Sequence, residues 1–447
     1  MYQDQRSIWD RIPTPALIVL WLLAIAFGAV MVFLAFFNPA ALQETPVTVP
    51  APTAVNVVGS VATSTAPAPQ PGEPAAPDGN LAPQPTIAPL HDPSMEFGIQ
   101  SDALTSDPAY AIGLLRDKLL LGWVKQQLRW GDFSPAPGQM DWSGFDRVVE
   151  AASTKDIRVL LSIVTAPEWS RPGVEGVEGP PNDLNEYARF VGEVVDRYQG
   201  KVQAIEIWNE QNIDSEWKTN PQAVSPEQYV EMLKLAYQAI KARDPDAMVI
   251  SGALSPTGFF SGGCDARGCD DQPYLKRMVE LGFLQYADCV GVHVNGYNLP
   301  PQYRHDEGYN DPTASFRGPF DNPHPSWSFR STLEDYYNII GKQKPLCVTE
   351  FGWASYEGIS DTALSSYEFG LDNTAEEQAQ WDADAFRLMQ EWGFVKLAIL
   401  FNLDFAQKSP LGAQDRTAPW SITDLQGAPR PAFDAVRDFM KGVLGIP

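Results

Sequence analysis

Short apolar runs alternate with longer amphipathic segments along most of the chain after residue 95. Eight of these runs resemble buried strands: 95–100, 122–130, 158–166, 202–210, 248–254, 289–295, 346–353 and 395–405. Between them, apolar residues recur at helical spacing, most clearly over 184–200, 225–247, 373–393 and 430–443. Eight strands alternating with helices predict a (β/α)8 TIM barrel over residues 96–447.

A doubly wound open sheet is the alternative α/β arrangement. Such sheets usually carry a glycine-rich turn after a strand, and no Gly-x-Gly-x-x-Gly motif follows any predicted strand here. The pattern therefore favours the barrel. In that fold the functional groups lie at the carboxyl ends of the strands.

An unbroken, uncharged apolar run covers residues 16–37. As a helix it is long enough to cross a bilayer, so it predicts a transmembrane anchor, with a cleaved signal peptide as the alternative. Arg6 and Arg11 precede the run, and the next basic residue is Arg116. The positive-inside rule then places residues 1–15 in the cytoplasm and the remainder outside, so we expect a single-pass membrane protein, or a secreted one if the segment is cleaved.

Residues 38–95 are rich in proline and alanine and contain no Phe, Trp, Tyr, Lys or Arg. Such a segment cannot bury enough apolar surface to offset the entropy of ordering it, and its prolines favour extended conformations. We expect a disordered linker that tethers the barrel to the membrane.

The chain is acidic, with 56 Asp and Glu against 32 Lys and Arg. This excess disfavours nucleic acid or an anionic lipid surface as the main partner. Cys264 and Cys269 lie in a Gly/Asp-rich loop and are candidates for a short disulfide, with a metal site as the rival interpretation. Cys289 and Cys347 lie in apolar runs and are interpreted as buried thiols. With no metal or nucleotide motif in the sequence, no cofactor is expected.

Polar side chains gather at the predicted strand ends. In the strand WVKQQLRW the alternation turns Lys125, Gln127 and Arg129 toward the barrel axis. Glu210 ends the fourth strand in WNE, and Glu350 ends the seventh in TEFGW. Two carboxylates on opposite sides of a barrel mouth can flank one glycosidic bond, one as the proton donor and one as the nucleophile.

WNE on strand four followed by VTEFGW on strand seven resembles the clan A glycoside hydrolases, in particular families 39 and 5. The resemblance extends over nearly all of 96–447 and includes the element WVKQQLRWGDFSPAPGQMDW. It implies that Glu210 is the acid/base, that Glu350 is the nucleophile and that Asn209 binds the neighbouring sugar hydroxyl. It also implies that His293 and Tyr297 line the subsite floor, with a tyrosine hydroxyl holding the nucleophile.

The sequence departs from these relatives at two places. The motif HVNGY separates His293 from Tyr297, and ILFNLDF supplies Phe401 where many relatives carry a tryptophan platform. Trp169 and Trp353 are candidate sugar platforms or packing residues, and Trp169 is the better platform candidate. The segment 296–327 follows strand six and is expected to form a lid or subsite wall.

Two further charged residues are assigned from their strand positions. Glu206 should point into the barrel below the site and pair structurally with Lys125 or Arg129. Arg129 is equally compatible with a structural ion pair and with a site role, and with Gln127 it is included among the expected substrate-binding residues.

Together these features predict a retaining β-glycosidase acting on an extracellular oligo- or polysaccharide. The alternatives are a barrel that binds polysaccharide without hydrolysing it, and a transglycosylase that uses the same residues. The sequence indicates neither the sugar nor the linkage.

Overall fold

The strands close into one parallel barrel in a computed structural model that describes residues 94–447, except 106, 177 and 261–262. Their order around the barrel is β1-β10-β9-β8-β5-β4-β3-β2. The bounds are β1 (Glu96–Gln100), β2 (Trp123–Arg129), β3 (Arg158–Val164), β4 (Ala204–Ile207), β5 (Met248–Ser251), β8 (Cys289–Gly296), β9 (Leu346–Trp353) and β10 (Val395–Leu400). The predicted (β/α)8 barrel is confirmed, although the fourth, fifth and eighth strands end three or more residues earlier than expected.

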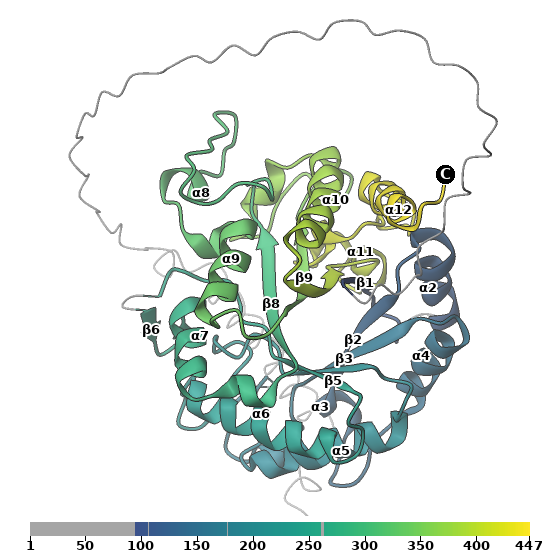
Figure 1. The fold of residues 1–447 in the computed structure, drawn as a ribbon, viewed down its shortest axis with the longest axis vertical. Helices are drawn as coiled ribbons and strands as arrows, with labels where there is room; N and C mark the ends of the chain where they lie inside the picture. The colour runs from purple at the N-terminus through teal and green to yellow at the C-terminus, as the bar shows by residue number, and fades with distance from the viewer. Residues whose placement is uncertain (1–93, 106, 177, 261–262) are drawn as a thin grey trace, which may run out of the picture. The chain divides into compact units, whose positions relative to one another are not determined.

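Helices surround the strands on the outside of the barrel (Figure 1). The longer ones are α2 (Pro108–Leu114), α4 (Ser143–Thr154), α5 (Leu184–Tyr198), α6 (Pro226–Lys241), α7 (Asp271–Glu280), α9 (Phe329–Ile339), α10 (Ala375–Trp392) and α12 (Pro431–Leu444). Short turns of helix are η3 (Leu115–Leu119), α3 (Trp130–Phe133), η4 (Glu168–Ser170), η6 (Phe283–Tyr286), α8 (Gly318–Asp321), η7 (Pro325–Trp327), η8 (Glu368–Leu371), α11 (Phe405–Lys408), η9 (Gly412–Gln414) and η10 (Ala418–Trp420).

The helix boundaries follow from local sequence signals. The Ser225 side chain caps α6 by accepting from the Gln228 amide, and Pro226 occupies the first turn, where a missing N–H costs nothing. The α10 helix begins at a reciprocal capping box between Thr374 and Glu377. It ends at Gly393, whose φ of 69° suits the left-handed C-terminal position.

The lower interior of the barrel is apolar and holds a disulfide between Cys289 and Cys347. The prediction of two buried thiols is therefore wrong. The two residues lie on neighbouring strands, where Gly291 of β8 is in register with Cys347 of β9. Both side chains point inward, and their Cα atoms are 5.8 Å apart, within the range that a disulfide spans. Sequence alone does not reveal this pairing because 58 residues separate the cysteines.

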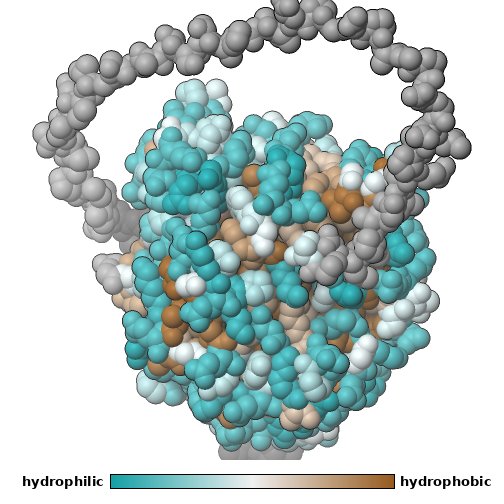
Figure 2. Space-filling model, viewed as in Figure 1, coloured by the Kyte–Doolittle hydropathy of each residue, from teal (hydrophilic) through white to brown (hydrophobic). Residues whose placement is uncertain are grey.

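The expected membrane span at 16–37, the cytoplasmic segment 1–15 and nearly all of the linker 38–95 lie outside the described residues. Within the described part of the chain, no helix has both the length and the apolar character needed to cross a bilayer. The face of the barrel domain drawn in Figure 2 is mostly hydrophilic, with hydrophobic residues in small separate patches.

Candidate active site

The end of β4 leaves regular strand geometry just before the candidate acid/base. The strand stops at Ile207, and Trp208 and Glu210 then adopt positive φ angles of 76° and 47°. The left-handed region is unfavourable for residues with a side chain, and such strain persists where surrounding contacts enforce it. The buried Trp208 indole donates to the Glu216 carbonyl at 3.1 Å, and the Glu210 amide donates to the Ala253 carbonyl at 2.8 Å. These contacts hold Glu210 at the barrel mouth.

Glu350 reaches the same region because β9 contains a bulge. Val292 of β8 pairs with Val348, but the next residue, His293, pairs with Glu350, which leaves Thr349 as the extra residue. A bulge re-aims the side chains that follow it. Consequently the Thr349 hydroxyl and the Glu350 carboxylate both point into the barrel, where each has a partner.

Lys125 is the ionic partner of Glu350. Its ammonium lies 2.9 Å from Oε1 of Glu350, 3.3 Å from Oε2 of Glu206 and 3.2 Å from the Thr349 carbonyl. Burial disfavours the charged ammonium, but the charges of Glu206 and Glu350 outweigh it and raise the pKa of Lys125. The lysine therefore stays charged next to the Glu350 carboxylate.

Glu206, the second partner of Lys125, makes two further hydrogen bonds inside the barrel. Its Oε1 accepts from the Thr349 hydroxyl at 2.6 Å, and its Oε2 accepts from the Ser162 hydroxyl. Glu206 is fully buried and faces Lys125, which agrees with the structural pairing expected for it. An internal ion pair needs such additional hydrogen bonds to offset the loss of hydration.

His293 lies between the two candidate catalytic carboxylates. Its Nδ1 is 3.1 Å from Oε1 of Glu210 and 3.8 Å from Oε2 of Glu350. Burial disfavours the imidazolium, but the charge of Glu350 and the hydrogen bond to Glu210 raise the pKa of His293. Burial also opposes ionisation of Glu210, yet contact with His293 holds the pKa of Glu210 below its usual value. His293 is fully buried, so it supports the carboxylates from behind and does not form the expected subsite floor.

A cavity of about 660 Å³ opens above the two glutamates, a size typical of small-molecule sites. Five of the expected substrate-binding residues line it, namely Gln127, Arg129, Asn209, Tyr297 and Phe401. It also contains residues that sequence reasoning missed: Gln100, Glu178, Glu216, Phe259, Tyr367, Phe369, Arg416 and Trp420. Most of these come from loops, where no periodic pattern signals which way a side chain points.

The polar residues of the second strand line one side of the cavity. The Gln127 amide lies 3.5 Å from Oδ1 of Asn209, so the two amides face each other next to Glu210. Arg129 is ion-paired with Glu178 at 2.6 Å and with Asp132 at 2.9 Å. The guanidinium of Arg129 therefore combines a structural pairing with a place in the cavity wall.

Tyr297 and Phe401 belong to an aromatic wall. The Tyr297 ring lies 4.8 Å from that of Phe369 and stacks on Phe316 at 6.0 Å. Burial raises the pKa of its hydroxyl to about 12. The contact expected between a tyrosine hydroxyl and the nucleophile is replaced by Lys125, which donates to Glu350 from the second strand.

The two candidate tryptophan platforms lie away from this cavity. Trp353 is fully buried among Phe329 and Trp381, and its indole donates to the Leu299 carbonyl, so no ring face is free for a sugar. Trp169 packs edge-on against Trp130 and lines a separate hollow. The platform role expected of Trp353 is therefore corrected, whereas Trp169 is half-buried and lies outside the cavity that holds Glu210 and Glu350.

The geometry thus defines a (β/α)8 barrel with two carboxylates at one mouth, joined by a shared histidine. Solved structures with this fold include a family 39 glycoside hydrolase from the gut symbiont Bacteroides cellulosilyticus WH2, with a TM-score of 0.57 and 18% identity. The alignment covers 80% of this chain and 66% of that one, so it spans just under two thirds of the relative.

Two further structures give a similar result. A glucosidase from Croceicoccus marinus aligns with a TM-score of 0.53 and 16% identity over 80% of this chain and 69% of that one. The β-glycosidase BGL167 aligns with a TM-score of 0.54 and 14% identity over 80% of this chain and 98% of that one. At these identities the similarity establishes the fold alone. No protein-family model and no curated protein sequence matches the chain.

Proposed function

We propose that the protein is a retaining β-glycosidase that hydrolyses O-glycosidic bonds of an oligo- or polysaccharide. The observation that carries this proposal is His293, whose Nδ1 lies within 3.8 Å of both carboxylates. The bridged oxygens of Glu210 and Glu350 can be no farther apart than the sum of the two distances. This upper bound falls just inside the lower end of the separation of about 6.5–9.5 Å typical of inverting enzymes, and every closer placement approaches the separation of about 5–5.5 Å that retaining enzymes need.

In the proposed reaction Glu350 attacks the anomeric carbon and forms a glycosyl ester, while Glu210 protonates the departing oxygen. Water then enters, Glu210 accepts its proton, and the ester is hydrolysed with net retention of configuration. Lys125 places its positive charge 2.9 Å from Oε1 of the attacking carboxylate. The Glu210–His293 pair supplies the transferable proton, because their hydrogen bond keeps a proton close to the leaving oxygen.

The decisive experiment uses the purified barrel domain with a panel of aryl β-glycosides and β-linked oligosaccharides, with the first products followed by NMR. We expect the β-anomer to appear first and turnover to vanish in Glu350→Gln. Full activity in Glu350→Gln would overturn the assignment, and the α-anomer as first product would replace retention by inversion. Longer glycans among the products would support a transglycosylase. Glycan binding without cleavage would support a binding barrel.

We also propose that the barrel acts outside the cell, tethered through residues 16–37. The support is the uncharged apolar run, the preceding Arg6 and Arg11 and the proline-rich segment that follows. Membrane fractionation with protease added to intact cells tests this. We expect the barrel to be membrane-bound and cleavable from outside, and protection from the protease would contradict the proposed orientation.

A further inference from the structure

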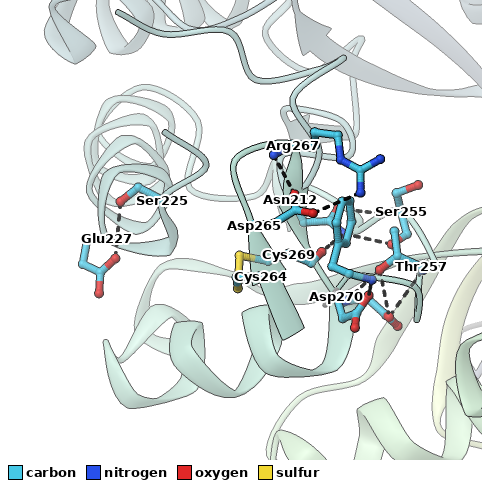
Figure 3. Close-up of a disulfide and its surroundings, with 12 residues drawn as sticks. Asn212, Ser225, Glu227, Ser255, Thr257, Cys264, Asp265, Arg267, Cys269 and Asp270 are labelled. Atoms are coloured by element: carbon cyan, nitrogen blue, oxygen red, sulfur yellow. Dashed lines mark hydrogen bonds and ion pairs between the residues drawn. A yellow bond between two sulfur atoms is a disulfide. The ribbon is translucent and has the colours of Figure 1, made fainter. Parts of the chain in front are cut away.

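The loops that follow β4 and β5 are joined by a disulfide hairpin. The strands β6 (Cys264–Asp265) and β7 (Gly268–Cys269) pair antiparallel, and Figure 3 shows the Cys264–Cys269 disulfide between them. The Cys269 amide donates to the Asn212 carbonyl at 2.8 Å, and the Asp214 amide donates to the Arg267 carbonyl at 2.7 Å. The hairpin therefore fixes the loop that begins at Glu210.

The same hairpin fixes the loop after β5. The Asn212 amide group accepts from the Ser255 N–H at 2.7 Å and donates to the Ser255 carbonyl at 3.0 Å (Figure 3). Oδ1 of Asp270 accepts the backbone N–H groups of Gly258, Phe259 and Phe260 at 2.7, 3.0 and 3.1 Å. The backbone of Phe259 is thus held rigidly against the hairpin.

Phe259 is an exposed aromatic residue on the cavity wall. Its relative exposure is 58%, and of the exposed large hydrophobic residues in the described part of the chain it alone lines the cavity with Glu210 and Glu350. The ring of Phe260 lies 4.8 Å behind it, and the Arg267 guanidinium covers Phe260 in turn. An apolar ring kept in water by a rigid backbone suits stacking on the apolar face of a sugar.

Glu216 supplies a polar group on the neighbouring loop. Its half-buried carboxyl lines the cavity and makes no hydrogen bond or ion pair with any described residue. Burial, reinforced by the charges of Glu210 and Glu178 and only partly opposed by Arg416 and Arg129, raises the pKa of Glu216 to about 8. A neutral carboxyl both donates and accepts hydrogen bonds, which matches the hydroxyl groups of a sugar.

We propose that Phe259 and Glu216 form the subsite for the sugar unit that departs with the proton from Glu210. Glu216 lies on the β4 loop that carries the proposed proton donor, and Phe259 lies on the neighbouring β5 loop. Phe401 and Trp420 line the opposite β10 side of the cavity. The inference rests on the proposed glycosidase function and deepens it. The preferred substrate is an oligo- or polysaccharide with an uncharged sugar on the leaving-group side.

The experiment compares two substrates with the same glycone, an oligosaccharide and the corresponding glycosyl fluoride, whose leaving group cannot occupy this subsite. Phe259→Ala and Glu216→Ala should each lower kcat/KM for the oligosaccharide by about tenfold relative to the fluoride, as expected for loss of one aromatic or hydrogen-bonding contact. Glu216→Gln should retain more oligosaccharide activity than Glu216→Ala. Tyr110→Ala, which removes an exposed aromatic residue outside the cavity, should leave both substrates unchanged.

An equal loss on both substrates, or an unchanged oligosaccharide rate in the two alanine variants, would overturn the inference while leaving the glycosidase function intact. A wild-type protein that cleaves neither substrate would remove the proposed function and this subsite with it. Thermal unfolding of each variant shows whether the fold is kept. If Phe259→Ala does not fold, Phe259→Leu provides the test, because it keeps apolar volume and removes the ring.

Discussion

Nζ of Lys125 lies 2.9 Å from Oε1 of Glu350, although 225 positions separate the two residues in the chain. The same ammonium is 3.3 Å from Glu206, so one cation serves a structural carboxylate and the proposed nucleophile together. Removing it would leave the buried Glu206 without a cation and Glu350 with only His293, whose Nδ1 is 3.8 Å away.

We therefore expect Lys125→Met to lower the free energy of unfolding by about 3–5 kcal/mol, the usual cost of breaking a buried ion pair. Urea denaturation measures this change. The matched control is Lys155→Met, which removes the exposed pair with Asp117 and should cost much less, because solvent screens that pair. Similar losses in the two variants would show that Lys125 does not stabilise the barrel.

The Glu210–His293 pair predicts a characteristic pH dependence of stability. The pKa of His293 is raised, so its contribution is complete below the usual value of 6.5 and is lost as the pH rises through the folded-state pKa. The pKa of Glu210 is lowered, so its contribution is complete above the usual 4.5 and is lost at lower pH. The difference in melting temperature between wild type and His293→Gln should therefore be largest between about pH 4.5 and 6.5.

The control for this experiment is His305→Gln, because burial lowers the pKa of His305 and its protonation opposes folding. That variant should not show the same maximum. A stability difference for His293→Gln that is flat across the pH range would contradict the charge pairing with Glu210.

Removal of the proposed proton donor should affect substrates unequally. In Glu210→Ala, we expect kcat/KM to fall by about 10²–10⁴ for substrates whose leaving group needs a proton, the usual range for general acid catalysis. For aryl glycosides with acidic phenols, the rate of the first step should fall much less, since these leaving groups depart without protonation. Steady-state kinetics over a series of phenols measures this, and a uniform loss would argue against the role of Glu210.

The two disulfides should differ in their contribution to stability. The Cys289–Cys347 bond joins residues 58 positions apart in the sequence, whereas the Cys264–Cys269 bond joins residues only 5 positions apart. Since the entropy removed from the unfolded chain grows with loop length, replacing Cys289 and Cys347 by alanine should cost about 2–4 kcal/mol, and more than replacing the other pair. Urea denaturation of both double variants measures the order, and a reversed order would contradict this account.

Much of the barrel could be predicted from local pattern. Buried strands and amphipathic helices are specified by residues close in sequence, as in α6 after Ser225 and α10 after Thr374. The positions of Glu210 and Glu350 followed from the strand order, because a closed parallel barrel gathers the carboxyl ends of its strands at one mouth.

The sequence by itself determined the barrel, the order of its strands and the two carboxylates at their ends. Only the tertiary structure decided that Thr349 forms a bulge, that Cys289 bonds to Cys347, and that Lys125 rather than a tyrosine holds Glu350. It also placed Phe259 and Glu216 on one wall. The physical reason is that strand and helix patterns repeat over a few residues, whereas register, ion-pair partners and loop directions depend on packing between distant segments.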